Sequence, residues 1–315
     1  MSSQEGVWSF AKTVITFLFD GTPISILIAL LVTLSLPIIY HIVLFRKRAS
    51  PPSCNFLLLG PSGAGKTAFA TLLESKSSLA SQKAHLTHTS QTSTLVTVKL
   101  PPTVPIASNQ YRSVNDSSLK DAANGTNYCV KDTPGHGKLR AAQGIAELQT
   151  MAMSKDAKNK LRGVVFMVDT AALVDEIILR DTAAYLHDVL LVLQKRELNS
   201  SSKKLSEIPV LVAANKQDLF TSLPPGSVRE KLEAEIDRIR KSRTKGLLDA
   251  SMDAGLDTEE DILGNDYAQG VFNFKMLEED TGVKVEVVGG AVKGDQQEET
   301  GSGVRRWEEW VGTCL

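Results

Sequence analysis

The sequence has too few cysteines for a disulfide framework and too little excess charge of either sign to require a nucleic-acid partner. Three scattered cysteines in 315 residues fit a reducing compartment rather than a secreted disulfide scaffold. Lysine and arginine number 35 against 36 for aspartate and glutamate, and we therefore expect no direct DNA binding. Hydrophobic residues make up 42% of the chain and charged residues 23%, which excludes a chain that is disordered throughout and one with many membrane spans.

One long stretch has no charged residue at all. Residues 24–45 contain no aspartate, glutamate, lysine or arginine, and a helix of this length rises about 33 Å, enough to cross a bilayer core. The basic residues Arg46, Lys47 and Arg48 follow directly. The positive-inside rule therefore predicts one transmembrane helix with the N-terminus outside the cytosol. A signal peptide and a buried core helix are the alternatives. The run is longer than the apolar region of a signal peptide, and a buried core helix of this length would usually contain a charged residue.

The rest of the chain alternates predicted strands with predicted helices. The strands are Phe56–Leu59, Leu95–Leu100, Tyr128–Val130, Val164–Val168, Val210–Ala214 and Val285–Val288. The helices are Thr67–Leu73, Thr182–Leu193, Val228–Leu248 and Val304–Val311. This alternation predicts an α/β fold with a mostly parallel sheet flanked by helices. An acidic run at 249–266, which has no lysine or arginine, is expected to be a solvated loop inserted in this domain.

These features predict four parts along the chain. They are a short segment outside the cytosol (1–23), a transmembrane helix (24–45), a basic and proline-containing linker (46–53) and a cytosolic domain (54–315).

The sequence GPSGAGKT has the spacing of a phosphate-binding loop. It follows an apolar strand and precedes a helical stretch, which is the context that such a loop needs. Its backbone N–H groups can surround phosphate oxygens, while its lysine adds positive charge and its threonine can ligate Mg²⁺. The predicted nucleotide-binding residues here are Gly60, Pro61, Ser62, Gly63, Ala64, Gly65, Lys66 and Thr67. This motif indicates a nucleoside triphosphate without identifying its base.

A second motif, NKQD, follows another predicted buried strand and indicates the base. The carboxylate of Asp218 can accept hydrogen bonds from the N1–H and the N2 amino group of guanine, a pair of donors that adenine lacks. Asn215 can hold the surrounding loops together, and the stem of Lys216 can cover one face of the base. In a chain that also has a phosphate loop, this pattern favours guanine.

A third motif, DTPGH, begins at Asp132, at the end of a predicted strand. Asp132 is in position to hold Mg²⁺, and the N–H of Gly135 can reach a γ-phosphate. The three motifs in this order resemble a GTPase of the Ras-like superfamily. The resemblance implies that His136 stands where Ras-type proteins commonly have a glutamine that orients the attacking water, so it is the candidate catalytic residue.

The DxPGH sequence and the predicted N-terminal anchor narrow the resemblance to the beta subunit of the signal recognition particle receptor. The resemblance implies that Thr92 is the switch threonine that ligates Mg²⁺ together with Thr67 and Asp132, although Thr87, Thr89 and Thr94 are nearby. It also implies that Ala291 and Val292 form the fifth motif, where a backbone N–H meets the guanine carbonyl. The glycine pair Gly289–Gly290 before this motif predicts a loose strand end.

The function that this resemblance implies is GTP-dependent anchoring of the receptor's alpha subunit at the endoplasmic reticulum during co-translational protein targeting. GTP or GDP and Mg²⁺ are the expected cofactors, and the lipid bilayer and the alpha subunit are the expected partners. An indirect association with the ribosome or the translocon stays open. Residues 1–23 would be lumenal, and hydrolysis would be slow or stimulated by a partner. The alternatives are a constitutive membrane scaffold with structural GTP and an Arf-like trafficking GTPase.

Overall fold

The computed structural model describes two compact units of the chain, Met1–Pro52 and Ser53–Leu315. The residues that it describes are 23–24, 26, 30–31, 33–37, 55–77, 90–101, 103–107, 126–154, 160–198, 207–254, 263–264, 270–295 and 303–315.

The described residues of the first unit are helical. Its leucine and isoleucine side chains are all more than half exposed, at Ile24, Ile26, Leu30, Leu31, Leu34 and Leu36. Within the residues that the structure describes, no helix has the length and apolar character needed to span a membrane. More than half of the predicted span at 24–45 lies outside those residues, so the transmembrane helix stays a prediction.

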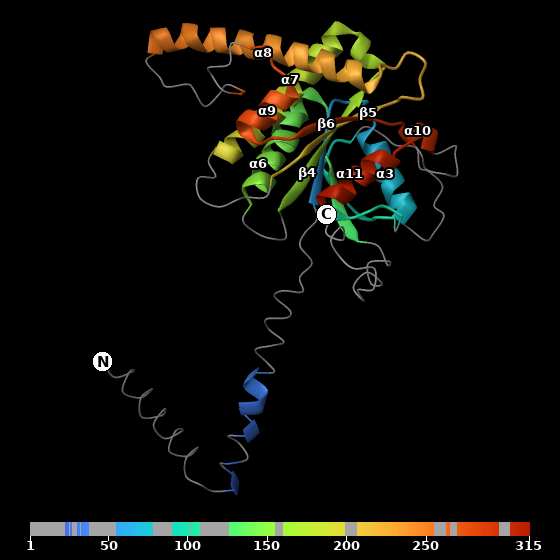
Figure 1. Ribbon diagram of the computed structural model, residues 1–315, viewed down its shortest axis with the longest axis vertical. Helices are drawn as coiled ribbons and strands as arrows, with labels where there is room; N and C mark the ends of the chain where they lie inside the picture. Colours follow the sequence, from blue (N-terminus) through green and yellow to red (C-terminus); the bar gives the residue numbers. More distant parts are fainter. Residues whose placement is uncertain are drawn as a thin grey trace. The chain divides into compact units, whose positions relative to one another are not determined.

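The second unit is built on a six-stranded sheet with the order β2-β3-β1-β4-β5-β6 (Figure 1). The strands are β1 (Asn55–Leu59), β2 (Thr94–Lys99), β3 (Asn127–Asp132), β4 (Leu161–Asp169), β5 (Val210–Asn215) and β6 (Val285–Gly289). Neighbouring strands pair in parallel, except β2 and β3, which are antiparallel. The predicted mostly parallel sheet and its six predicted strands are confirmed.

Helices connect the strands and extend beyond the predicted ranges. They are α3 (Lys66–Ser77), α5 (Gly137–Leu139), the π-helix η2 (Arg140–Ile145), α6 (Ala146–Met153), the 3₁₀ turn η3 (Ala172–Val174), α7 (Glu176–Leu198), α8 (Pro225–Ala254), α9 (Phe274–Thr281), α10 (Val292–Asp295) and α11 (Arg305–Cys314). The four predicted helices correspond to α3, α7, α8 and α11. The segment from α5 to α6, together with α9, was not predicted, because these helices are short.

The expectation of a loop throughout the acidic run is wrong for its first residues. Helix α8 continues to Ala254, so residues 249–254 are helical. Ala250, Met252 and Ala254 lie among the acidic residues there, and their high helix propensity outweighs two aspartates. Most of 255–266 lies outside the described residues.

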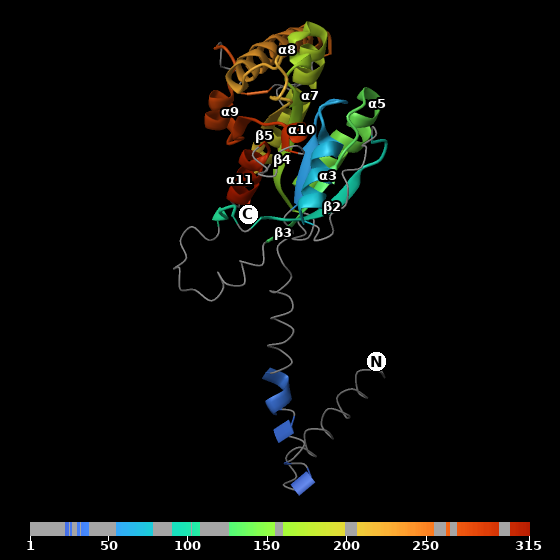
Figure 2. The same ribbon diagram turned by 90° about the vertical axis from the view of Figure 1, so that its right-hand side faces the viewer.

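Two separate apolar layers enclose the sheet, one on each face. Helices α6, α7, α8 and α9 pack on one face, and α3 and α11 pack on the other, as Figures 1 and 2 show from two directions. Trp307 of α11 is fully buried, and its ring meets Phe69 of α3 edge to face at 5.3 Å. Its indole N–H also donates to the carbonyl of Val288 at 3.0 Å. The final helix is therefore fixed to the sheet next to the end of β6.

Candidate functional site

The predicted site residues converge at one edge of the sheet. The phosphate loop follows β1, the third motif follows β3, the NKQD motif follows β5 and the fifth motif follows β6. Because these four strands are parallel, their carboxyl ends lie at the same edge, which is where open α/β sheets bind ligands. Segments that lie far apart in the sequence therefore form one site.

The phosphate loop needs glycine because it passes very close to its neighbours. Gly60 and Gly65 have φ angles of 134° and 97°, which side-chain-bearing residues rarely adopt. A Cβ at Gly60 would lie 2.2 Å from the carbonyl oxygen of Met167, and one at Gly65 would lie 2.4 Å from Nδ2 of Asn215. The loop is therefore closely packed against β4 and against the NKQD motif, which we call the base motif. It leads into the N-terminus of α3.

Lys66 is a buried cation inside this loop. Its Nζ donates to the carbonyl oxygens of Gly60 at 2.7 Å and Pro61 at 2.8 Å. Burial lowers the pKa of Lys66 to about 8, and the negative charge of Asp132 opposes that shift. A largely dehydrated ammonium group surrounded by loop backbone is well suited to a negatively charged phosphate.

Thr67 and Asp132 form a hydrogen-bonded pair of oxygen-bearing side chains next to the loop. The hydroxyl of Thr67 donates to Oδ2 of Asp132 at 2.7 Å. Asp132 is fully buried, and its Oδ1 has no hydrogen-bond partner among the described residues. Burial raises the pKa of Asp132, while the Thr67 hydrogen bond and the charge of Lys66 lower it. A carboxylate oxygen and a hydroxyl in this arrangement fit Mg²⁺, which prefers oxygen ligands.

The third motif lies directly against the phosphate loop. A Cβ at Gly135 would be 2.4 Å from Nζ of Lys66 and 2.6 Å from the carbonyl oxygen of Gly60. His136 is exposed, and its carbonyl accepts hydrogen bonds from the N–H groups of Leu139 and Arg140. Gly135 is thus the part of this motif that is nearest to the phosphate loop, whereas the His136 side chain is open to solvent.

Asn215 connects three loops of the site, as its position in the motif predicts. Its Nδ2 donates to the carbonyl of Ala64 at 2.8 Å, and its Oδ1 accepts from the N–H of Val292 at 3.1 Å. Since Asn215 is buried, these hydrogen bonds are shielded from water. They join the phosphate loop to the base motif and to the fifth motif.

Asp169, which the sequence analysis does not single out, holds Lys216 of the base motif in place. Lys216 has a φ of 66°, and its Nζ lies 2.5 Å from Oδ2 of Asp169. Asp169 is the last residue of the buried strand β4, and a carboxylate at that strand end was the available signal. Asp218 is exposed at the same edge, with its carboxylate accessible to a ligand.

The strand end before the fifth motif is firmly held, so the expectation that it is loose is wrong. The N–H of Gly290 donates to the carbonyl of Ala214 at 3.0 Å, and the carbonyl of Gly290 accepts from the N–H of Gln217 at 3.2 Å. Ala291 and Val292 are buried next to it. Backbone hydrogen bonds to β5 and to the base motif compensate for the flexibility of the glycines.

Thr92 lies just before β2 and is exposed. The register of the antiparallel pair places Thr94 opposite Asp132, so Thr92 approaches the same sheet edge. The structure gives no hydrogen bond between Thr92 and the Thr67–Asp132 pair in the part of the chain that it describes. Thr87 and Thr89 lie outside that part.

Comparison with known proteins identifies a family that this chain resembles. Residues 52–281 match the model of a family described as signal recognition particle receptor beta subunit. Signal recognition particle receptor subunit beta of Saccharomyces cerevisiae is 26% identical over 274 residues, which cover 86% of this chain and 87% of the yeast protein.

Solved structures from Chaetomium thermophilum have the same fold. The SRb-GTP/SRX complex of the signal recognition particle receptor contains a chain that is 35% identical, with a TM-score of 0.61 over 82% of this chain and 98% of that one. The SRb-GDP-Mg structure is 36% identical, with a TM-score of 0.54 over 82% of this chain and 96% of that one.

Proposed function

This chain belongs to the signal recognition particle receptor beta subunit family, and we propose that its GTP-bound form holds an alpha-type receptor subunit at the endoplasmic reticulum for co-translational protein targeting. The observation that carries this proposal is the assembly of a phosphate loop, a DTPGH motif and an NKQD motif at one edge of the sheet. Co-purification of that subunit in GTP and in GDP tests it.

In this proposal the phosphates lie over residues 60–67 and the base lies between the NKQD and fifth motifs. Lys66 contacts the β- and γ-phosphates, because its buried ammonium group lies inside the loop. Asp218 accepts the guanine N1–H and N2 amino donors. Lys216 covers one face of the base, with its ammonium group held by Asp169. Ala291 and Val292 would line the guanine carbonyl; because the Val292 N–H donates to Asn215 and the Ala291 N–H to the carbonyl of Gly303 in this structure, either would have to exchange that hydrogen bond for one to the base.

Thr67 and Asp132 are the residues that would hold Mg²⁺. The hydroxyl of Thr67 and Oδ1 of Asp132, which has no hydrogen-bond partner among the described residues, would supply oxygen ligands. The SRb-GDP-Mg structure of a relative supports the choice of metal. Thr92 would join them when residues 90–93 close over the nucleotide. When bound, Mg²⁺ neutralises phosphate charge.

The proposed partner follows from the relative that was solved as an SRb-GTP/SRX complex. Gly135 lies against Lys66 and the start of the phosphate loop, so its backbone can respond to a γ-phosphate. Thr92 and Gly135 would then order the surface that the partner binds, as in other nucleotide-dependent switches. His136 orients water for a slow, partner-stimulated hydrolysis, and its exposure leaves it accessible to such a partner.

The proposed membrane anchor is residues 24–45, followed by a linker at 46–53 and the nucleotide-binding domain at 54–315. In the described part of this stretch, large apolar side chains such as Leu30 and Leu34 are more than half exposed, which suits contact with lipid. The hydroxyl of Thr33 donates to the carbonyl of Leu30 at 3.0 Å, so this polar group is satisfied within its own helix. The basic residues Arg46, Lys47 and Arg48 place the larger part of the chain in the cytosol.

This topology predicts a specific protease-protection pattern. In sealed microsomes that carry the full chain, a tag at residue 1 should resist added protease, whereas the domain that follows the linker should be digested. Detergent should expose the tag as well, which serves as the control. Digestion of the N-terminal tag together with protection of the C-terminal domain would reverse the proposed orientation.

A further inference from the structure

The segment that follows the third motif contains a π-helix held against α7. After α5, the chain forms the π-helix η2 over Arg140–Ile145 and then continues as α6. π-helical turns are rare and are frequent at functional sites. Gly144 is the buried residue of η2, and a Cβ there would lie only 2.4 Å from the Tyr185 hydroxyl of α7. The π-helix therefore lies in direct contact with α7.

Arg140, the first residue of η2, is bound to α7 by two kinds of contact. Its guanidinium donates two parallel hydrogen bonds to the carboxylate of Asp181, each at 2.8 Å. The same guanidinium lies 5.2 Å from the centre of the Tyr185 ring. Bidentate geometry and stacking on an aromatic ring distinguish this contact from an ordinary surface ion pair. We call Arg140, Asp181 and Tyr185 the clasp.

Tyr185 also links the clasp to the phosphate site. Its ring is buried and meets Phe166 of β4 edge to face at 5.4 Å. Its hydroxyl lies beside Gly60 and Thr133, yet it makes no hydrogen bond of good geometry within the described residues. The ring is thus a fixed platform between the phosphate loop and Arg140, and it holds this place through packing rather than through its hydroxyl.

We propose that the clasp holds Gly135 against the phosphate loop, and that Arg140, Asp181 and Tyr185 are positioning residues that set the preference for a nucleoside triphosphate over the diphosphate. Arg140 is five residues from Gly135 in the sequence, and short helical turns join them. Gly135 lies against Lys66 and Gly60, and in the proposed function its N–H contacts the γ-phosphate, which a diphosphate lacks. Loosening the clasp should therefore weaken binding of the triphosphate alone. This inference rests on the proposed function.

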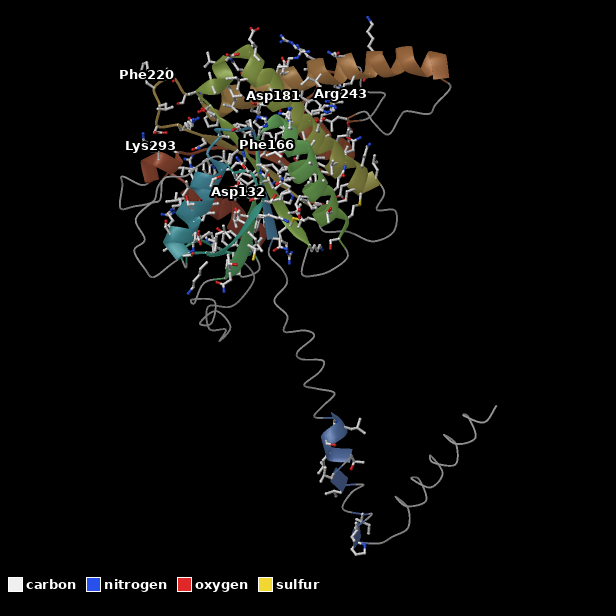
Figure 3. All side chains as sticks on the ribbon, turned by 180° about the vertical axis from the view of Figure 1, so that it is seen from behind. Asp132, Phe166, Asp181, Phe220, Arg243 and Lys293 are labelled. Carbon is white, nitrogen blue, oxygen red and sulfur yellow. The ribbon has the colours of Figure 1, made fainter. Side chains whose placement is uncertain are left out.

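The test compares Asp181→Asn with Asp188→Asn in the full chain, using a non-hydrolysable GTP analogue and GDP. Asp188 is the matched control, because it lies on the same helix and pairs with Arg243 at 2.8 Å rather than with Arg140; Figure 3 labels Asp181 and Arg243. We expect Asp181→Asn to weaken binding of the analogue by about fivefold while GDP binding is unchanged. Asp188→Asn should change neither.

Substitutions of Tyr185 separate its ring from its hydroxyl. Tyr185→Leu removes the surface on which Arg140 stacks and should lower the preference for the triphosphate as Asp181→Asn does. Tyr185→Phe keeps the ring and removes only the hydroxyl, so this variant should retain most of the preference for the triphosphate over the diphosphate. Thermal unfolding of each variant without nucleotide identifies any general loss of stability.

The outcomes distinguish a failure of the clasp from a failure of the proposed function. If the wild-type chain binds both nucleotides and Asp181→Asn keeps the same ratio of affinities, the clasp proposal is overturned. Equal weakening of both nucleotides would also overturn it, because Asp181 would then have a structural role only. If the wild-type chain binds neither guanine nucleotide, the proposed function itself fails.

Discussion

Replacement of Asp218 by asparagine should change the preferred base from guanine to xanthine. In the proposed site the carboxylate accepts from the guanine N1–H and N2 amino groups, whereas an amide has one acceptor oxygen and an NH₂ group that donates. Xanthine carries a 2-oxo group in place of the amino group, so the new amide N–H can donate to it. A site built on polar pairing can discriminate by up to about 10⁴-fold when a partner is missing.

The exposed position of Asp218 at the sheet edge makes this substitution informative about binding. The side chain has no structural hydrogen bond within the described residues, so we expect Asp218→Asn to fold as the wild type does. Titration of the purified domain with GTP and with XTP gives the two affinities. A variant that still prefers GTP would show that Asp218 does not contact the base.

Replacement of Lys66 by alanine should nearly abolish binding of the triphosphate without changing the choice of base. The ammonium group can make two charge-assisted hydrogen bonds to phosphate oxygens, and each contributes about 1.5–3 kcal/mol. Their loss weakens binding by at least about 100-fold. Lys76→Ala, at the other end of α3, is the control for a lysine on the same helix and should leave the affinity unchanged.

The buried position of Lys66 also predicts a pH dependence of binding. Its pKa is lowered to about 8 by burial, and a bound phosphate stabilises the charged form and raises the pKa again. Above pH 8 the free protein must therefore take up a proton when it binds, and the affinity falls by up to about tenfold per pH unit. Below pH 8 the affinity is flat with respect to this group. Calorimetry between pH 7 and 9 measures how the nucleotide affinity of the wild type depends on pH. An affinity independent of pH would contradict the assignment of Lys66 as the phosphate-binding group.

The sheet and the main motifs could be predicted from the sequence because their signals are local. Each predicted strand is a short apolar run, and four of the parallel strands end in a recognisable motif. The convergence of Gly60, Asp132 and Asn215 then follows from the parallel topology alone. The fold and the composition of the candidate site were therefore predictable to a large extent.

Other parts of the site depend on tertiary contacts that leave no pattern in the sequence. Asp181 and Arg140 are ordinary surface charges in the sequence, and only the packing of η2 on α7 brings them together. The firm hold on Gly290 could not be foreseen either, because its backbone partners come from β5 and the base motif. The acidic residues after Leu248 suggested a loop, and helix propensity prevailed over charge as far as Ala254.

The central claim is that the nucleotide controls attachment of an alpha-type receptor subunit. The most direct measurement purifies the full chain from detergent-solubilised membranes, loads it with GTP or GDP, and quantifies the alpha-type subunit that stays bound. We expect binding with GTP and little binding with GDP. His136→Ala should keep this difference, because the histidine is proposed to act in hydrolysis rather than in attachment. Equal binding of the subunit with GTP and with GDP would contradict the proposal and would favour a constitutive scaffold.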